Sequence, residues 1–285
     1  MENVKGKVAV VTGATSGLGR WIAEDLAAHH ATTVLVGRSE PRVQAAAREI
    51  IAQTQNANVH PLPVTDLGVR SESARVAATL LEQYPRIDLL VNNAGAYFHR
   101  REVTPEGLER TFALNVLAPF ILTSRLLPRL EGSAPARVVM VASDAHHGHE
   151  VDFGDLQSTG KYRGYRAYGR SKLELILLTR EFARRLGGKG VTVNAVHPGF
   201  VASGFGRNNG GAVGFGIGLI GRLFGRDVRK AARDVLFAAA DPSLDQVTGQ
   251  YLSRRFVRTG SPQSRDMAAA LRVYESCAEL SRPVP

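Results

Sequence analysis

The sequence predicts an α/β fold, a doubly wound parallel sheet with helices on both faces. Short β-branched runs alternate with helical stretches of 12 or more residues as far as Val196, and a glycine-rich turn follows the first run. Because parallel strands are joined by long right-handed crossovers, this alternation favours one buried sheet. The chain has 285 residues, of which 44% are apolar, which is ordinary globular composition. We therefore expect a single domain over residues 1–285.

Each element has its own signal in the chain. The run 7–12 (KVAVVT) is apolar and β-branched, and residues 18–29 then carry apolar side chains at helical spacing. Pro105 stands at a helix-opening position before a long apolar stretch. By the same reasoning we expect strands at 33–37, 58–64, 88–91, 137–142 and 191–196, and helices at 40–54, 69–84, 105–130 and 165–186.

Three segments lie outside the alternation. Residues 144–167 form an insertion expected to carry substrate contacts, and residues 252–285 form a C-terminal extension. Residues 204–225 hold nine glycines among apolar side chains, so we expect 204–226 to act as a lid over an apolar substrate. The same side chains could instead form a contact in a homodimer or homotetramer, or enter a membrane surface.

Net charge and cysteine content indicate which binding partners and which cellular compartment to expect. The net charge is +10, and nine Lys or Arg lie between residues 161 and 189, which favours a phosphate-rich small molecule or an acidic carrier protein. The sequence shows no zinc-finger spacing, aromatic RNA-binding motif or basic arm, so we expect no nucleic acid. The single cysteine, the polar start at 1–7 and the short apolar stretch 212–224 predict a cytoplasmic protein with no transmembrane segment.

The turn after the first strand is a candidate dinucleotide site. It reads TGATSGLG and opens the first helix. Gly13, Gly17 and Gly19 would let the backbone turn tightly and approach a pyrophosphate, whose charge the free amides and the positive helix end can hold. An ordinary tight turn is the alternative, and the position directly after the first strand favours the dinucleotide site.

The ends of the second and third strands suggest which dinucleotide is bound. Arg38 stands where an NAD-specific site usually carries an acidic group, and a guanidinium can bind a 2′-phosphate in bidentate fashion. We therefore expect NADP(H), against the alternative of a solvated arginine. Asp66 would either reach the adenine edge or cap the following helix.

The motifs occur together in the order found in short-chain dehydrogenases/reductases. They are TGATSGLG, residues 92–95 (NNAG), Asn115, Ser143, residues 168–172 (YGRSK) and residues 198–199 (PG). The chain resembles this family over residues 5–203. Tyr168 stands 25 positions after Ser143, and residues 145–148 (AHHG) follow the serine, which resembles the retinol dehydrogenase branch. The resemblance implies a Rossmann-type sheet and an oxidoreductase.

The resemblance also implies the positions that contact the cofactor. Ala142 replaces a serine that commonly precedes the catalytic one, and Ser203 replaces a threonine whose hydroxyl bonds the nicotinamide carboxamide; we expect both changes to preserve activity. The implied cofactor-binding residues are Gly13, Thr15, Ser16, Gly17, Leu18, Gly19, Arg38, Asp66, Leu67, Asn93, Ala94, Gly95, Tyr168, Lys172, Pro198, Gly199, Val201 and Ser203.

Four residues form the predicted catalytic set: Asn115, Ser143, Tyr168 and Lys172. Tyr168 and Lys172 are four positions apart, so they share a helix face, and a nearby ammonium favours the phenolate. Tyr168 would protonate the substrate oxygen that Ser143 holds by a hydrogen bond. Lys172 would also hold the nicotinamide ribose, and by resemblance Asn115 would anchor a water that links Lys172 to a proton relay. The alternative, an amphipathic pair with no chemistry, is disfavoured because Ser143 follows a strand at the ligand-binding edge.

Other polar and aromatic residues lie near this set. His146, His147 and His149 raise the possibility of a metal site, but no cysteine accompanies them, so we expect no metal and interpret them as shaping the loop. Tyr162 and Tyr165 would line or cover the pocket, or else pack on the surface.

The sequence thus predicts an NADP(H)-dependent oxidoreductase that interconverts a carbonyl and an alcohol. The expected substrate is bulky and apolar, such as a retinoid, steroid or polyketide, either free or bound to a carrier. One alternative is reduction of a carbon–carbon double bond by an enzyme of the same family. Another is a non-catalytic NADP-binding scaffold, since a fold alone does not prove chemistry.

Overall fold

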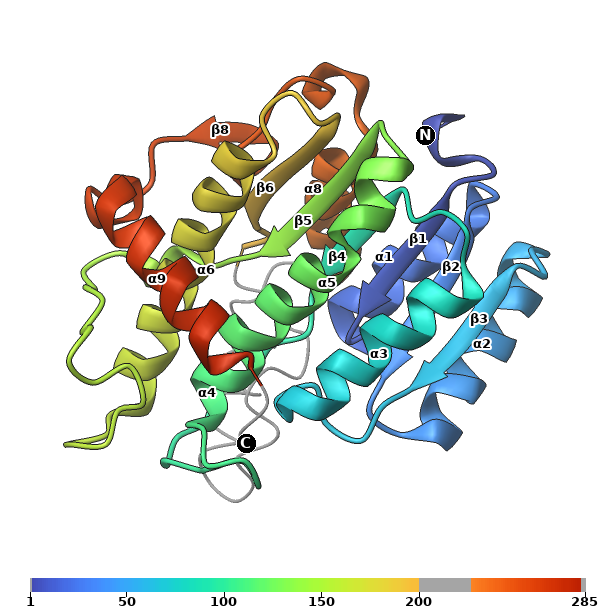
Figure 1. Cartoon of the computed structure of the whole chain (residues 1–285). Coiled ribbons are helices and arrows are strands. Elements are labelled where there is room, and N and C mark those ends of the chain that lie inside the picture. The colour runs from blue at the N-terminus through green and yellow to red at the C-terminus, as the bar shows by residue number, and fades with distance from the viewer. Residues whose placement is uncertain (1, 200–226, 283–285) are drawn as a thin grey trace.

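One eight-stranded sheet organises the chain (Figure 1). The structure, a computed structural model, describes residues 2–199 and 227–282. The strand order is β3-β2-β1-β4-β5-β6-β7-β8, and all neighbours are parallel except the last pair. The doubly wound fold is confirmed. The strands are β1 (Val8–Thr12), β2 (Thr32–Gly37), β3 (Val59–Pro63), β4 (Leu89–Asn92), β5 (Ala136–Val141), β6 (Val191–His197), β7 (Tyr251–Ser253) and β8 (Phe256–Arg258).

Helices cover both faces of the sheet, each over its own apolar core (Figure 1). One layer holds α1, α2 and α8, and the other holds α3, α5, α6 and α9. Because both faces are covered, β1 and β4 are buried along their whole length. The helices are α1 (Gly17–Ala28), α2 (Glu40–Thr54), α3 (Arg70–Gln83), α4 (Arg110–Phe112), α5 (Ala118–Gly132), α6 (Gly164–Arg185), α8 (Val228–Ala240) and α9 (Met267–Leu280), with short turns η1 (Glu2–Val4), η2 (Ala113–Leu117), η3 (Asp144–His146), η5 (Pro242–Leu244) and η6 (Gln263–Arg265).

The strand order reverses between β1 and β4. In open parallel sheets, ligands bind outside the carboxyl ends of the strands at such a switch point. The turns after β1, β4 and β5 therefore open at one edge of the sheet, and these are the turns that carry the motifs singled out in the sequence.

The helix expected at 105–130 begins later than its proline suggested. Pro105 lies in a turn closed by a bond from the Gly107 N–H to the Thr104 carbonyl, 2.9 Å long. The buried Glu109 carboxylate caps α4, and the Glu106 carboxylate accepts bonds from the first two amides of α3. Because both glutamates cap helices from outside, residues 102–109 stay non-helical.

The helical stretch Arg110–Gly132 is long and apolar enough to cross a membrane. Its best window has a mean hydropathy of 1.3, but 78% of that window is buried inside the protein. Such burial is typical of a core helix in a globular domain.

The predicted C-terminal extension contains the helix α9, which packs on α6. The Tyr274 ring of α9 lies edge-on to Phe120 and Phe182, with ring centroids 5.0 and 5.3 Å apart. Edge-to-face packing adds about 0.5–1.5 kcal/mol per pair beyond area burial. The predicted lid, 204–226, lies outside the described residues, as do Val201 and Ser203.

Candidate active site

The glycine turn after β1 is built so tightly that only glycine fits. Gly13 and Gly17 have φ of +69° and +54°, in the left-handed region that glycine adopts without cost. A Cβ on Gly19 would lie 2.3 Å from the Gly13 carbonyl oxygen and 2.5 Å from Asn93 Nδ2. Ser16, the exposed N-cap of α1, makes no side-chain cap hydrogen bond. The turn thus presents backbone amides and a hydroxyl at a helix N-terminus, which suits a phosphate.

The segment after β4 closes this turn from the other side. Thr12 Oγ1 accepts hydrogen bonds from the Asn93 and Ala94 amides at 3.0 and 2.9 Å, and Asn93 Nδ2 donates to the Thr12 carbonyl at 2.8 Å. Asn92 instead points into the sheet and donates to Thr123 Oγ1 at 3.1 Å. Asn93 and Ala94 therefore lie at the crevice, whereas Asn92 supports the sheet from within.

Arg38 directly follows β2, so it lies at the same carboxyl edge of the sheet as the glycine turn. Arg38 is exposed and follows Gly37, where a Cβ would lie 2.4 Å from Thr15 Cγ2 of the glycine turn. The end of β2 and the turn after β1 are therefore in direct contact. Because no other strand lies between them, Arg38 is placed beside the site that the glycine turn forms.

Asp66 has a partner that the sequence did not suggest. Its Oδ2 accepts a hydrogen bond from Arg110 at 2.9 Å, and its Oδ1 accepts one from the Gly68 amide at 2.8 Å. The N-cap of α3 is Val69, so the helix-cap interpretation of Asp66 is wrong. Leu67 and Leu18 are buried in the two cores, so any cofactor contact they make is through the backbone.

Tyr168 and Ser143 meet at the end of β5. Tyr168 lies in the first turns of α6, Ser143 follows β5, and a hydrogen bond joins their hydroxyl groups. Burial raises the pKa of Tyr168 to about 12, and the bond to Ser143 offsets only part of that rise. The Tyr97 ring lies edge-on to the Tyr168 ring, with centroids 6.3 Å apart.

Lys172 lies beneath this pair. Its Nζ donates to the Val141 carbonyl at 2.9 Å and lies 5.6 Å from the centre of the Tyr168 ring. Burial lowers the pKa of Lys172 to about 8. The sequence leads us to expect that this ammonium, together with a cationic oxidised nicotinamide, favours the phenolate of Tyr168; desolvation acts in the opposite direction and is the largest influence on the pKa of both groups.

Asn115 occupies the π-helical turn η2, an irregularity frequently found at functional sites. Its Oδ1 accepts from the Ala96 amide at 2.9 Å, and its Nδ2 donates to the Ala96 carbonyl and to Ser171 Oγ, both at 3.0 Å. A Cβ on Gly95 would lie 3.2 Å from Asn115 Oδ1 and 3.3 Å from Lys172 Nζ. Asn115 therefore joins the loop after β4 to the catalytic helix, within reach of Lys172.

The remaining predicted cofactor positions follow β6. Pro198 and Gly199 come directly after the strand, and Gly199 has φ of +87°. They end the described chain before the gap, at the same edge of the sheet as Ser143.

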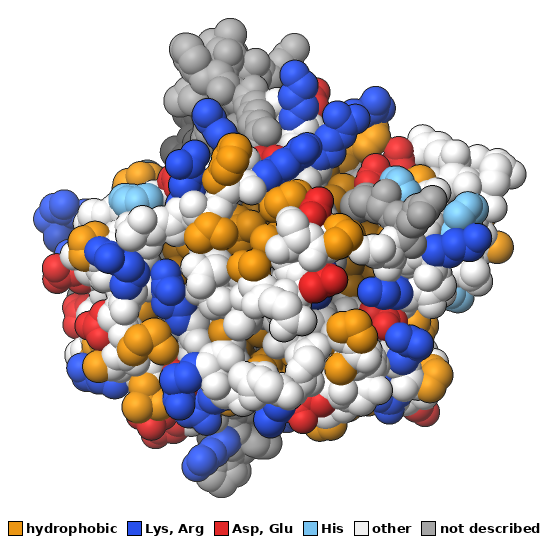
Figure 2. All heavy atoms as spheres, turned by 90° about the horizontal axis from the view of Figure 1, so that it is seen from above, with side chains coloured by type: hydrophobic (Ala, Val, Ile, Leu, Met, Phe, Trp, Pro, Cys, Tyr) orange, Lys and Arg blue, Asp and Glu red, His pale blue; other side chains and the backbone are white. Residues whose placement is uncertain are grey.

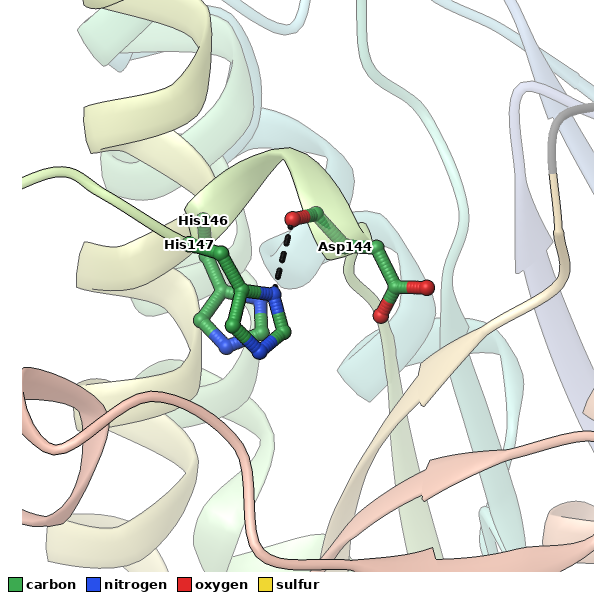
Figure 3. A group of neighbouring side chains, drawn as sticks. All are labelled: Asp144, His146 and His147. Atoms are coloured by element: carbon green, nitrogen blue, oxygen red, sulfur yellow. Dashed lines mark hydrogen bonds between the residues drawn. The ribbon is translucent and has the colours of Figure 1, made fainter.

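The histidines after Ser143 lie close together with Asp144 (Figure 3). The His146 ring is buried, its Nδ1 bonds the Ser143 carbonyl at 2.8 Å, and its Nε2 accepts from the Ser261 amide at 3.1 Å. His147 is exposed and bonds the Asp144 carbonyl at 3.0 Å. A metal ligand needs a free nitrogen lone pair, and both nitrogens of His146 are engaged. The geometry therefore favours a structural role for His146.

The insertion is held by Arg170, which the sequence did not single out, and by Tyr162, which it did. Arg170 of α6 is buried and donates to the carbonyls of Asp155 and Leu156 at 2.9 and 2.7 Å. The Tyr162 hydroxyl donates to the Phe98 carbonyl at 3.0 Å, whereas Tyr165 is 64% exposed. Tyr162 thus packs the insertion against the loop after β4. The only sequence signal for Arg170 is its place inside YGRSK.

A second missed residue on α6 is Glu174, which is buried beside Arg170. Arg170 Nε lies 3.5 Å from Glu174 Oε1, and that oxygen has no hydrogen-bond partner. Burial raises the pKa of Glu174 to about 8. The carboxyl group is therefore neutral over most of the physiological pH range.

The fold and the site together define a dinucleotide-dependent oxidoreductase. The chain matches the family model described as short chain dehydrogenase over residues 7–212. It is 35% identical to human retinol dehydrogenase 13 over 283 residues, covering 97% of this chain and 85% of that protein. It is 38% identical to human retinol dehydrogenase 12 over 279 residues, covering 96% and 86%. The protein belongs to the short-chain dehydrogenase/reductase family, in its retinol dehydrogenase-like branch.

Solved structures agree with this assignment. A Mycobacterium paratuberculosis protein of uncharacterized function has a TM-score of 0.79 at 28% identity, covering 98% of this chain and 94% of that chain. A Beutenbergia cavernae protein has a TM-score of 0.69 at 27% identity, covering 89% and 96%. The latter is assigned provisionally as an NAD(P)-dependent gluconate 5-dehydrogenase and holds NADP at low occupancy.

Proposed function

We propose that the protein is an NADP(H)-dependent oxidoreductase that interconverts a carbonyl and an alcohol on a bulky apolar substrate. The observation that carries this proposal is the hydrogen-bonded pair of Tyr168 and Ser143, above Lys172 and at the same sheet edge as the glycine turn. An acid, a hydrogen-bond donor and a dinucleotide turn at one edge are what carbonyl reduction needs.

The choice of NADP(H) rests on Arg38 and the turn beside it. The close approach between residues 13 and 19 leaves no room for a side chain, which fits a pyrophosphate against backbone amides. Arg38 is exposed at the end of β2, where its guanidinium can bind a 2′-phosphate. The NADP found in the B. cavernae relative is in keeping with this choice.

Ser143, Tyr168 and Lys172 have different roles in the proposed reaction. A reduced nicotinamide, when bound at this edge, would supply a hydride to the carbonyl carbon. Ser143 donates a hydrogen bond to the carbonyl oxygen, and Tyr168 gives its phenolic proton to that oxygen, so that carbonyl, hydride and proton become the alcohol. Because its pKa is about 12, Tyr168 carries that proton throughout the physiological range. Lys172, fixed by the Val141 carbonyl, lies where it can bind the nicotinamide ribose.

The substrate class is proposed from the aromatic surroundings and the relatives. The Tyr97 ring lies against the Tyr168 ring, and the two human relatives are named retinol dehydrogenases. Figure 2 shows the face at the amino ends of the strands, opposite the candidate site, where Lys and Arg side chains are interspersed with Asp, Glu, apolar and uncharged surface.

A carrier-bound substrate receives less support from the basic stretch 161–189. Arg170 and Lys172 are buried, and Arg184 and Arg185 share Glu181. Lys161, Arg163 and Arg166 are exposed and would have to contact the carrier protein.

We also propose a cytoplasmic location for the protein. The buried cysteine Cys277, which forms no disulfide, supports this location, and subcellular fractionation tests it.

A screen with NADPH tests the function. Aromatic, retinoid, steroid and polyketide-like ketones, aldehydes and enones are offered, with loss of NADPH absorbance and chromatography of the product as readouts. We expect alcohols from ketones or aldehydes. Saturated products from enones alone would favour carbon–carbon double-bond reduction, and NADPH binding without turnover of any compound would favour a scaffold.

The matched variant pair is Tyr168→Phe and Tyr274→Phe. Tyr168→Phe removes the proton donor, so kcat should fall by about 1000-fold while NADPH affinity changes by less than about twofold. Tyr274→Phe keeps the ring packing of α9 and should leave both unchanged. Unchanged turnover in Tyr168→Phe would refute the mechanism.

A further inference from the structure

A cluster of side chains directly behind Ser143 has no part in the proposed reaction. The Asp144 carboxylate accepts a hydrogen bond from the Tyr251 phenol of β7, and it lies 3.1 Å from His197 Nε2 at the end of β6. The Asp144 amide donates to His197 Nδ1 at 3.2 Å. Because Nδ1 accepts, the proton of a neutral imidazole is on Nε2 and is donated to the carboxylate. One residue thus binds both edges of the His197 ring.

The same turn is tied to a third element. His146 bonds the Ser143 carbonyl through Nδ1 and accepts from the Ser261 amide through Nε2. Its ring also lies edge-on to Tyr251, with centroids 4.9 Å apart. The Asp144 and His146 side chains therefore connect the turn after Ser143 to β6, to β7 and to the loop after β8.

Tyr251 and His197, the two partners of Asp144, are largely buried, so they need hydrogen-bond partners within the protein. Tyr251 is 1% exposed, so its phenol needs an acceptor inside the protein, and Asp144 provides one. The Asp144 side chain is 54% exposed, so only part of it is removed from water. The half-exposed Asp144 carboxylate thus binds the buried Tyr251 phenol and the nearly buried His197 imidazole, and these contacts fix the surface turn to the sheet.

We propose that Asp144 is a positioning residue which, with His197 and Tyr251, fixes the Ser143 hydroxyl at the oxygen-binding point of the site. The inference rests on the proposed function, because that function makes Ser143 the donor to the substrate oxygen. Ser143 caps the short turn η3, and its hydroxyl accepts a hydrogen bond from the Ala145 amide at 3.2 Å, so the hydroxyl is only as well placed as that turn. A displacement of about 1 Å at a reacting group can cost about 100-fold in rate.

The kinetic test compares three variants with an alcohol-forming substrate from the screen. Asp144→Ala should lower kcat by about 10- to 100-fold and leave the KM for NADPH within about twofold, because the nucleotide turn lies on other strands. Tyr251→Phe keeps the ring and removes one donor, so kcat should fall by about three- to tenfold. Glu82→Ala, which removes an exposed carboxylate of α3, should match the wild type.

Hydrogen exchange measured by mass spectrometry supplies a readout that does not need turnover. The peptides covering residues 142–148 and 259–264 should exchange faster in Asp144→Ala and Tyr251→Phe than in the wild type, while the β1 peptide is unchanged. If Asp144→Ala does not fold, Tyr251→Phe decides. Unchanged kcat, or lowered kcat with unchanged exchange in 142–148, would overturn the positioning role.

The two hypotheses fail in different ways. If the wild type reduces no carbonyl compound, the proposed function fails, and exchange alone then decides whether Asp144 fixes the turn. If the wild type is active and the Asp144 variants equal it, the proposed function stands and the inference is refuted.

Discussion

The two halves of the site are built from different parts of the chain. The nucleotide half, around the turn after β1, is made mainly by backbone: left-handed glycines, amides at a helix end, and Thr12 bonded to the amides of residues 93 and 94. The half around Ser143 is made by side chains that come from far away, such as Tyr251 and the loop at Ser261. The backbone half tolerates almost no added atom, whereas the side-chain half depends on buried polar partners.

The largest effect is expected in the backbone half. Gly19→Ala places a Cβ 2.3 Å from the Gly13 carbonyl oxygen, so the turn must open and NADPH affinity should fall by about 10- to 100-fold. Fluorescence titration with NADPH measures this. Gly132→Ala is the control, because nothing lies within 4 Å of a Cβ at that position. If Gly19→Ala binds NADPH within about twofold of the wild-type affinity, the nucleotide half does not depend on this backbone contact, and the contrast between the two halves is wrong.

Arg38 sharpens the comparison, since it is the side chain that we propose to select NADP(H) in the nucleotide half. Arg38→Ala should weaken NADPH about tenfold and leave NADH unchanged, because a charge-assisted bond to the 2′-phosphate is lost. Arg38→Asp should weaken NADPH further by repulsion. Arg48→Ala, at an exposed position of α2, is the control. Equal losses for the two cofactors would refute the selector role.

The smallest effect concerns stability in the side-chain half. The pKa of Glu174 is raised from 4.5 to about 8, so the folded protein binds a proton that the unfolded chain releases, and this group costs stability as pH rises from about 4.5 to about 8. Glu174→Gln removes that cost. Relative to wild type, its free energy of unfolding should therefore be about 1 kcal/mol larger at pH 8 than at pH 7, as measured by urea unfolding. Glu275→Gln, exposed on α9, should show no such difference, and a pH-independent effect in Glu174→Gln would contradict the prediction.

The sequence predicted the sheet, its helices and the family well, because alternating apolar runs and contiguous motifs carry that information. It misplaced one helix start, since Pro105 is a local signal, whereas Glu106 binds the distant amides at the start of α3 and the helix cap is Glu109. It also predicted an acidic Tyr168, because a spacing of four residues shows proximity to Lys172 but not the desolvation of both groups.

The sequence by itself determined the glycine turn, the order of the motifs and the helix face shared by Tyr168 and Lys172, because each depends on backbone geometry over a few neighbouring residues. Only the tertiary structure decided that Arg110 binds Asp66 and that Tyr251 binds Asp144. The first contact joins residues 44 positions apart, and the second depends on the pairing of β6 with β7, which brings together residues 107 positions apart.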